Sequence, residues 1–227
     1  MCGRYALIVN PAEAREDFEG VVFPAKFAPR YNIAPTQPVL AIPNDGRRAA
    51  DFFIWGLIPS WAKDSSIGNR LINARGETLA EKPAFRGGYK YKRCLILADG
   101  FYEWKSQPGT KTKIPHFIHL KSGKPFAFAG LWDEWHSAEG SSIRSCTIVT
   151  TAPNQLMASI HNRMPVILHP KDYAEWLDTA PRAPESLKHL IREFPAEPME
   201  AYPVSTLVNN PANDRAECAM PLQKPAA

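Results

Sequence analysis

Short apolar runs recur along the whole chain, and Gly, Pro, Asn or Asp separate most of them. Runs of this length that are rich in β-branched and aromatic residues and bounded by turn residues are typical of β-strands. We therefore expect strands at residues 4–9, 38–42, 52–58, 94–98, 116–120, 126–132, 144–150 and 164–168.

Helical patterns are fewer and shorter. The clearest begins at Asn10, where an Asn cap, Pro11 at the first helical position and Glu13 at the third predict a helix that runs to Gly20. Further helices are expected at residues 77–81, 154–159, 171–177 and 185–194.

The order of these elements predicts the fold class. Strands that follow one another through turn-length links favour an α+β fold with mostly antiparallel β-sheets and a few short peripheral helices. The 22 prolines are spread along the chain of 227 residues, and neither a repeat nor a linker interrupts it. We therefore expect one compact domain over residues 1–227, with a loosely structured tail after Asn210.

The cysteines and the length of the apolar runs indicate in which compartment and in which class of protein this chain belongs. No run approaches the roughly 18 apolar residues of a membrane span, and no signal peptide is recognisable. The four cysteines lack metal-site spacing, so we expect a cytoplasmic protein without a metal, cofactor or disulfide framework. Cys94 and Cys146 each lie in an apolar run and should be buried.

Positive charge is concentrated locally although the net charge is only +4. Residues 67–93 contain seven basic side chains against Glu77 and Glu81, and residues 104–124 contain five lysines and no carboxylate. Aromatic residues lie among them, which favours a groove that binds a phosphate backbone while bases stack on rings. A solvated lysine-rich surface explains the same charges equally well.

Several segments combine reactive side chains with turns or strand ends. In ADGFYEW (98–104), strand alternation places Phe101 and Glu103 on one face and Tyr102 and Trp104 on the other. Glu103 is therefore either a half-buried general acid or one partner of a structural ion pair. His161 stands at the head of an apolar strand, where it is either a base or an ordinary turn residue.

Other motifs for chemistry are absent or unsuitable. His116 and His119 should face opposite sides of a strand, so that pair does not form a metal site. The sequence has no G-x-S-x-G, Walker or H-E-x-x-H pattern. A Cys–His hydrolase with Cys2 as nucleophile and His161 as base stays open.

Taken together, the segments resemble one family. MCGRYAL, YNIAPTQ, WGLIPSWAKD, NARGET, KPAFR, RCLILADGFYEW, FAGLW, TIVTTAPN, IHNRMPVIL and YPVSTLVNNP occur in the order found in the SRAP (SOS response-associated peptidase) family, also called abasic site processing proteins. Leu97 departs from the usual proline, and NDRAEC departs from the usual C-terminal ending. The resemblance implies a barrel-like fold.

The resemblance also implies a function. Removal of Met1 would expose Cys2, which would form a thiazolidine crosslink with abasic sites in single-stranded DNA, with associated lyase and self-processing peptidase activity. Asn73, Glu103 and His161 would complete the site. The phosphates would be held by Arg4, Arg75, Arg86 and Arg163. The protein would act as a cytoplasmic monomer that joins the nucleoid when bound to DNA. A cysteine peptidase and a non-catalytic nucleic-acid-binding module are the alternatives.

Overall fold

The computed structural model describes residues 2–222. The strands in this part of the chain are β1 (Tyr5–Leu7), β2 (Arg30–Ile33), β3 (Pro38–Pro43), β4 (Asp51–Trp55), β5 (Asn73–Arg75), β6 (Arg93–Ala98), β7 (Gly100–Ser106), β8 (Lys113–Leu120), β9 (Phe126–His136), β10 (Ser142–Thr151), β11 (Met164–Pro165), β12 (Ile167–Leu168) and β13 (Met199–Pro203).

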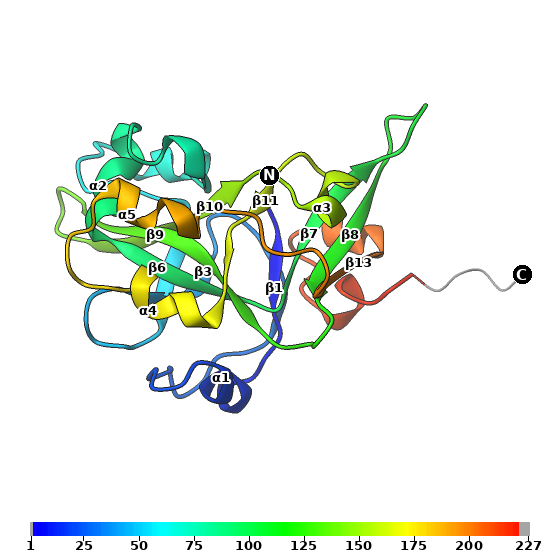
Figure 1. Ribbon diagram of the computed structural model, residues 1–227, viewed down its shortest axis with the longest axis horizontal. Coiled ribbons are helices and arrows are strands. Elements are labelled where there is room, and N and C mark those ends of the chain that lie inside the picture. The colour runs from blue at the N-terminus through cyan, green and yellow to red at the C-terminus, as the bar shows by residue number, and fades with distance from the viewer. Residues whose placement is uncertain (1, 223–227) are drawn as a thin grey trace, which may run out of the picture.

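Short helices lie around these strands (Figure 1). The α-helices are α1 (Pro11–Asp17), α2 (Pro83–Tyr91), α3 (Gln155–Ala158), α4 (Tyr173–Trp176) and α5 (Pro184–Leu187). The 3-10 helices span Ser65–Arg70, Gly76–Thr78, Pro170–Asp172, Lys188–Leu190, Thr206–Asn209 and Ala216–Cys218.

Two sheets organise the fold. The strands β10, β4, β3, β6 and β9 pair in this order, and β9 pairs again with β10, so they close a barrel. β4 and β5 are parallel to β10, whereas the other pairs are antiparallel. A second, antiparallel sheet has the order β13-β8-β7-β1-β2. The predicted α+β, mostly antiparallel and barrel-like fold is therefore confirmed.

The chain passes from the barrel to the second sheet between β6 and β7. A Cβ atom at Gly100 would lie 2.2 Å from the ring of Phe117, so only glycine permits this close approach of the two strands. Asp99, just before it, accepts hydrogen bonds from the backbone N–H groups of Ile8 and Val9 and thereby ties the end of β1 to this crossing.

One large cluster of buried residues joins the two sheets, with Tyr5, Phe101 and Ile118 from the second sheet packed against Ile96 and Phe128 of the barrel. A smaller cluster lies on the other face of the second sheet. Tyr102 and Phe117 belong to it, so the predicted alternation along residues 98–104 is confirmed. Cys94 and Cys146 are buried, as expected.

The helices differ from the prediction in extent. α1 has the predicted capping box, in which Asn10 accepts from the N–H of Glu13 and Glu13 accepts from that of Asn10, but it ends at Asp17. The helix expected over 185–194 is α5 followed by a single 3-10 turn. The longest α-helix of the described residues, α2, was not predicted.

The segment after Asn210 also differs from the prediction. Residues 211–222 are held against both edges of the second sheet. The Asp214 carboxylate accepts from the backbone N–H groups of Tyr31 and Asn32 of β2 at 2.6 and 3.0 Å, and the N–H of Leu222 donates to the carbonyl of Pro203 at the end of β13. Cys218 is fully buried in the smaller cluster. The loose tail was therefore a wrong expectation for these residues, and residues 223–227 lie outside the described part.

Arg93, from the basic segment, is fully buried at the start of β6. Within residues 2–222 its guanidinium forms no ion pair with a carboxylate and instead donates to the backbone carbonyls of Tyr89, Lys90, Trp176, Asp178 and Ala180. These bonds join the end of α2 to the segment that follows α4. Arg93 therefore stabilises the fold, and its buried guanidinium cannot contribute to the predicted phosphate-binding groove.

Arg93→Lys should lower the free energy of unfolding by about 3 kcal/mol, because an ammonium cannot reach this set of acceptors and leaves buried carbonyls unpaired. Urea denaturation measures the change. Arg86→Lys on the exposed side of the adjoining helix is the control and should stay within about 0.5 kcal/mol of the parent. Equal midpoints for Arg93→Lys and the parent would contradict this assignment.

Candidate active site at the amino terminus

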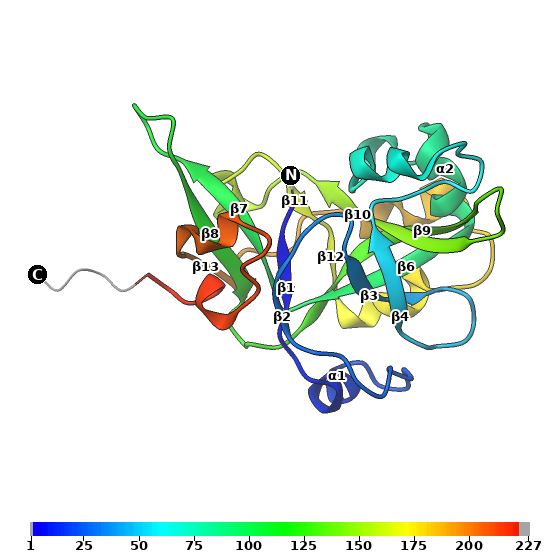
Figure 2. The same ribbon diagram turned by 180° about the vertical axis from the view of Figure 1, so that it is seen from behind.

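The segments that carry Cys2, Asn73 and Glu103 meet at one edge of the molecule (Figure 1). The start of the chain lies beside β10 and β11 in both views, close to the position where the barrel meets the second sheet (Figures 1 and 2). β5 reaches this end because it pairs in parallel with the last part of β10, with Asn73 opposite Ile148.

Cys2 is fully buried ahead of β1. The side-chain Nδ2 of Asn73 donates to the backbone carbonyl of Cys2 at 2.8 Å, so this hydrogen bond fixes the orientation of the Cys2 backbone. The Oδ1 atom of Asn73 is also buried and has no hydrogen-bond partner among the described residues. It is an acceptor available to an amine or a hydroxyl group.

Glu103 lies in the middle of β7 and is only 3% exposed. Burial raises the pKa of the Cys2 thiol, and the negative charge of the Glu103 carboxylate raises it further. The carboxylate and the thiol therefore interact electrostatically. At neutral pH the thiol is held in its protonated form, because its pKa lies well above the ordinary value.

His161 follows α3 and is partly buried. Asn154 caps α3 by accepting from the N–H of Met157 at 2.9 Å, and the backbone N–H of His161 donates to the carbonyl of Met157 at 2.8 Å. The ring Nδ1 accepts from the backbone N–H of Arg163 at 3.1 Å. In the neutral ring the proton therefore resides on Nε2, which can donate.

Arg163 is paired with other residues of this end of the molecule. Its guanidinium donates to both carboxylate oxygens of Glu77 and, at 2.8 Å, to the backbone carbonyl of Thr150. The hydrogen bond from Arg163 lowers the pKa of Glu77. Because Thr150 lies opposite Arg75 in the β5–β10 pair, Arg163 and Arg75 are placed close together.

Arg4 is directed toward the second sheet. It donates to Oδ1 of Asn32 at 2.8 Å and to the carbonyl of Val208, and its guanidinium lies 5.9 Å from the ring centre of Trp104. Burial lowers its pKa. Arg4 is thus held in place by the fold, one residue beyond the glycine that follows Cys2.

Arg75 and Arg86 are both exposed but occupy different places. Arg75 ends β5, two residues beyond Asn73. Arg86 lies on α2, beside a separate cavity of about 530 Å³ whose lining includes the exposed rings of Trp61 and Tyr91. The structure therefore places Arg75 next to the site residues and Arg86 on the flank formed by α2.

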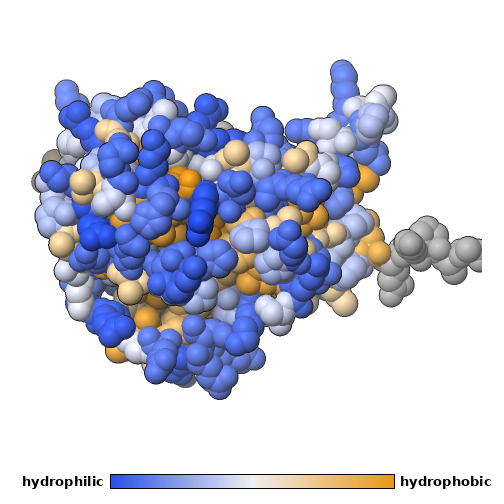
Figure 3. Space-filling view, viewed as in Figure 1, coloured by the Kyte–Doolittle hydropathy of each residue, from blue (hydrophilic) through white to orange (hydrophobic). Residues whose placement is uncertain are grey.

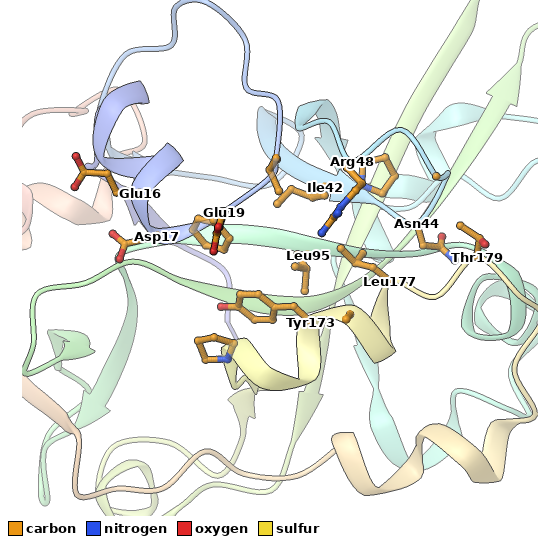
Figure 4. Close-up of a pocket in the computed structure, with 16 residues that line it drawn as sticks. Glu16, Asp17, Glu19, Ile42, Asn44, Arg48, Leu95, Tyr173, Leu177 and Thr179 are labelled. Carbon is orange, nitrogen blue, oxygen red and sulfur yellow. The ribbon is translucent and has the colours of Figure 1, made fainter.

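A cavity of about 670 Å³ lies elsewhere and contains none of the predicted site residues. In Figure 4, Tyr173 and Leu177 line one side, and Glu19 and Arg48 approach from the opposite side. Hydrophilic residues cover most of the face shown in Figure 3, with apolar surface between them near the middle. Because the cavity of about 670 Å³ contains none of the predicted site residues, the candidate active site is the cluster around Cys2.

The described residues show neither a metal cluster nor a membrane-spanning helix. No three His, Cys, Asp or Glu side chains within residues 2–222 are grouped in a way that could hold a metal ion. None of the helices in that range is long and apolar enough to cross a membrane.

The sequence analysis did not identify the residues that form hydrogen bonds with the predicted arginines. Glu77 and Thr150 bind Arg163, and Asn32 binds Arg4. Glu77 stood within the NARGET motif, which was the only signal for it. For Asn32 and Thr150 nothing but the folded structure brings the partners together.

The chain is similar to known proteins over most of its length. The model of the "SOS response associated peptidase (SRAP)" family matches residues 1–211. The chain is 49% identical over 220 residues to the abasic site processing protein YoqW of Bacillus subtilis, covering 96% of this chain and 98% of that one. It is 32% identical to the abasic site processing protein HMCES of Gallus gallus over 267 residues, covering 98% of this chain and 78% of that one.

Solved structures share the fold. A protein from Bacteroides thetaiotaomicron superposes with a TM-score of 0.84 at 24% identity, covering 98% of this chain and all of that one (100%). A phage-related protein from Bordetella bronchiseptica gives a TM-score of 0.70 at 31% identity, covering 89% of this chain and 94% of that one.

A closed barrel joined to an antiparallel sheet is the fold that this chain shares with these solved structures. This chain belongs to the SRAP family.

Proposed function

We propose that this protein binds abasic sites in single-stranded DNA and forms a covalent thiazolidine crosslink through Cys2, after Met1 has been removed. Met1 lies outside the described residues, and its removal is part of the proposal. The names of the relatives support this function, since they are abasic site processing proteins. The observation that carries it is the Asn73 hydrogen bond that fixes Cys2 beside the buried Glu103.

The terminal amine is the first nucleophile in this mechanism. An abasic deoxyribose is in equilibrium with an open-chain aldehyde, which an amine attacks to give a carbinolamine and then, with loss of water, an imine. At about pH 7.5 an α-amine of pKa about 7.7 to 8.0 is roughly one third neutral, whereas a lysine of pKa about 10.4 is neutral in about one molecule in a thousand.

The thiol closes the ring. It adds to the imine carbon, its proton passes to the imine nitrogen, and a five-membered thiazolidine results. The addition is intramolecular, so it benefits from a high effective concentration of the thiol. A reversible imine thereby becomes a lasting adduct, with one water released overall.

The neighbouring residues have separate roles in this proposal. Glu103 transfers protons during loss of water from the carbinolamine and opening of the sugar ring. Asn73 orients Cys2, and its Oδ1 accepts from the amine or a sugar hydroxyl. His161 donates from Nε2 to a sugar hydroxyl or a leaving phosphate, and assists strand scission when the imine is not trapped.

The arginines provide binding that does not depend on sequence. Arg75 and Arg163 lie beside the site, Arg4 holds the start of β1, and Arg86 extends the positive surface along α2. Contacts with phosphates alone make binding sensitive to salt. In this proposal the protein acts as a monomer, and self-removal of Met1 is a property of the same site.

A general cysteine peptidase is a weaker candidate. Such enzymes need a thiolate, which requires a lowered pKa of the cysteine. Burial and Glu103 raise the pKa of the Cys2 thiol instead. A mechanism that begins with the amine does not need the thiolate for its first step.

The test uses protein that begins at Cys2 and a single-stranded oligonucleotide with one abasic site. We expect a denaturant-resistant band whose mass equals protein plus DNA less one water. The control carries one extra residue ahead of Cys2, which turns the amine into an amide. That control should bind DNA without crosslinking, and the absence of a crosslink from the mature protein would refute the proposed function.

A further inference from the structure

His116 lies directly opposite Glu103 across the β7–β8 ladder. Residues directly opposite in an antiparallel pair have side chains on the same face, with Cβ atoms about 4.5–5.5 Å apart. The flanking pairs agree with this, since Phe101 and Ile118 enter the large core cluster, while Tyr102 and Phe117 enter the smaller one on the other face. His116 therefore shares the face on which Glu103 and Cys2 lie.

The two side chains differ in their access to water. Glu103 is 3% exposed, whereas His116 is only partly buried. The ring Nδ1 of His116 lies 3.1 Å from the carbonyl oxygen of Ile114. A carbonyl only accepts, so Nδ1 carries the proton in the neutral ring and Nε2 has a lone pair available.

Few charged groups face His116 from the neighbouring strands. On β7 these are Glu103, directly opposite, and Lys105, diagonally placed and exposed. On β13 the residue opposite His116 is Pro203, and Ala201 follows on the same face. On β8 itself the neighbours on this face are Ile114 and Ile118. Glu103 is therefore the only carboxylate that these strands present to His116.

We propose that His116 exchanges protons between solvent and Glu103 during crosslinking. Nε2 takes a proton from water or buffer, and the resulting imidazolium passes it through a bridging water molecule to the Glu103 carboxylate, which lies opposite it in the ladder. Glu103 then gives it to the carbinolamine hydroxyl, which departs as water. The proton taken from solvent thus ends in the released water and leaves an iminium cation. The iminium N–H proton returns to solvent through Glu103 and His116, so the neutral imine that the thiol attacks is formed without net proton uptake.

This role rests on the proposed function, because it requires Glu103 to transfer protons at the abasic sugar. It also fits the geometry, since Glu103 is only 3% exposed and has little direct contact with solvent through which to exchange protons. His116 does not contact the sugar. It acts through Glu103, as a positioning residue that delivers protons to that carboxylate.

The test compares single-turnover crosslinking by the parent, His116→Gln and His119→Gln, each beginning at Cys2. His119 is the matched control, because it lies on the same strand but on the opposite face, where it stacks on Phe117 and contacts Glu200. Rates are measured from about pH 6 to about pH 9, a range that spans the ordinary titration of histidine, with and without added imidazole. Binding of an intact single strand is measured in parallel.

We expect His116→Gln to crosslink about tenfold more slowly near neutral pH, with unchanged binding, and imidazole to restore the rate in proportion to its concentration. His119→Gln should follow the parent at every pH. Parental rates from His116→Gln, or a slower rate that imidazole leaves unchanged, would overturn the relay and leave the proposed function intact. A parent that does not crosslink would refute the proposed function itself.

Discussion

Cys2→Ala, in protein that begins at residue 2, should form no crosslink that survives denaturation unless a hydride reductant is added. Alanine keeps the terminal amine, so the imine still forms, but it has no thiol to close the ring. The imine then hydrolyses when the protein unfolds. With borohydride present, the imine is reduced to a stable amine and a band should appear on a denaturing gel.

The control for this prediction is Cys218→Ser, because Cys218 is also fully buried but lies in the smaller cluster, where its thiol donates to the carbonyl of Asn213. Serine can make the same donation, and crosslinking should match the parent. Loss of the small Cys2 side chain costs about 1 kcal/mol of stability, which leaves the protein folded. A Cys2→Ala protein that crosslinks durably without reductant would contradict thiazolidine formation.

Most strands of the barrel could be predicted because they are short apolar runs that end at a turn residue, as at residues 94–98 and 126–132. β2, β5 and β13 were not predicted, because their sequences RYNI, NAR and MEAYP are not apolar runs. The pairing of the strands could not be predicted in the same way. The barrel closes because β10 pairs with β9 along one edge and in parallel with β4 and β5 along the other, and only the folded chain brings Cys146 opposite Trp55.

Helix α2 was missed for an identifiable physical reason. It contains Gly87 and Gly88, and a glycine in a helix is about 1 kcal/mol less favourable than alanine. Packing outweighs this cost, because Phe85 and Tyr89 are buried and a Cβ at Gly88 would lie 3.3 Å from the Cβ of Leu131. The local preference of the sequence was overridden by contacts with β9.

The candidate site was predicted residue by residue through the family motifs, but its internal arrangement was not. The sequence grouped Arg93 with the phosphate-binding charges, whereas the fold buries it among backbone carbonyls. It also gave no sign that Asn73 binds the Cys2 carbonyl or that His116 stands opposite Glu103. These contacts join segments distant in sequence, so they depend on strand register.

Glu103→Gln should slow single-turnover crosslinking by about 100-fold, although the same change makes the thiol more acidic. The Glu103 charge raises the pKa of the Cys2 thiol, so its removal lowers that pKa and increases the thiolate fraction at a given pH. If thiolate formation limited the reaction, Glu103→Gln would crosslink faster than the parent. If proton transfer by Glu103 limits it, the rate falls, because general acid–base catalysis contributes about 10²–10⁴-fold.

The two effects therefore have opposite signs and can be measured separately. The rate of Cys2 alkylation against pH, followed by mass spectrometry, reports the thiol, and the rate of crosslink formation reports the proton transfer. Glu200→Gln is the matched control, because Glu200 lies on β13 and contacts His119 on the opposite face of the same sheet. An increased crosslinking rate in Glu103→Gln would show that the carboxylate restrains the thiol and takes no part in proton transfer, and His116 would then have no group through which to act.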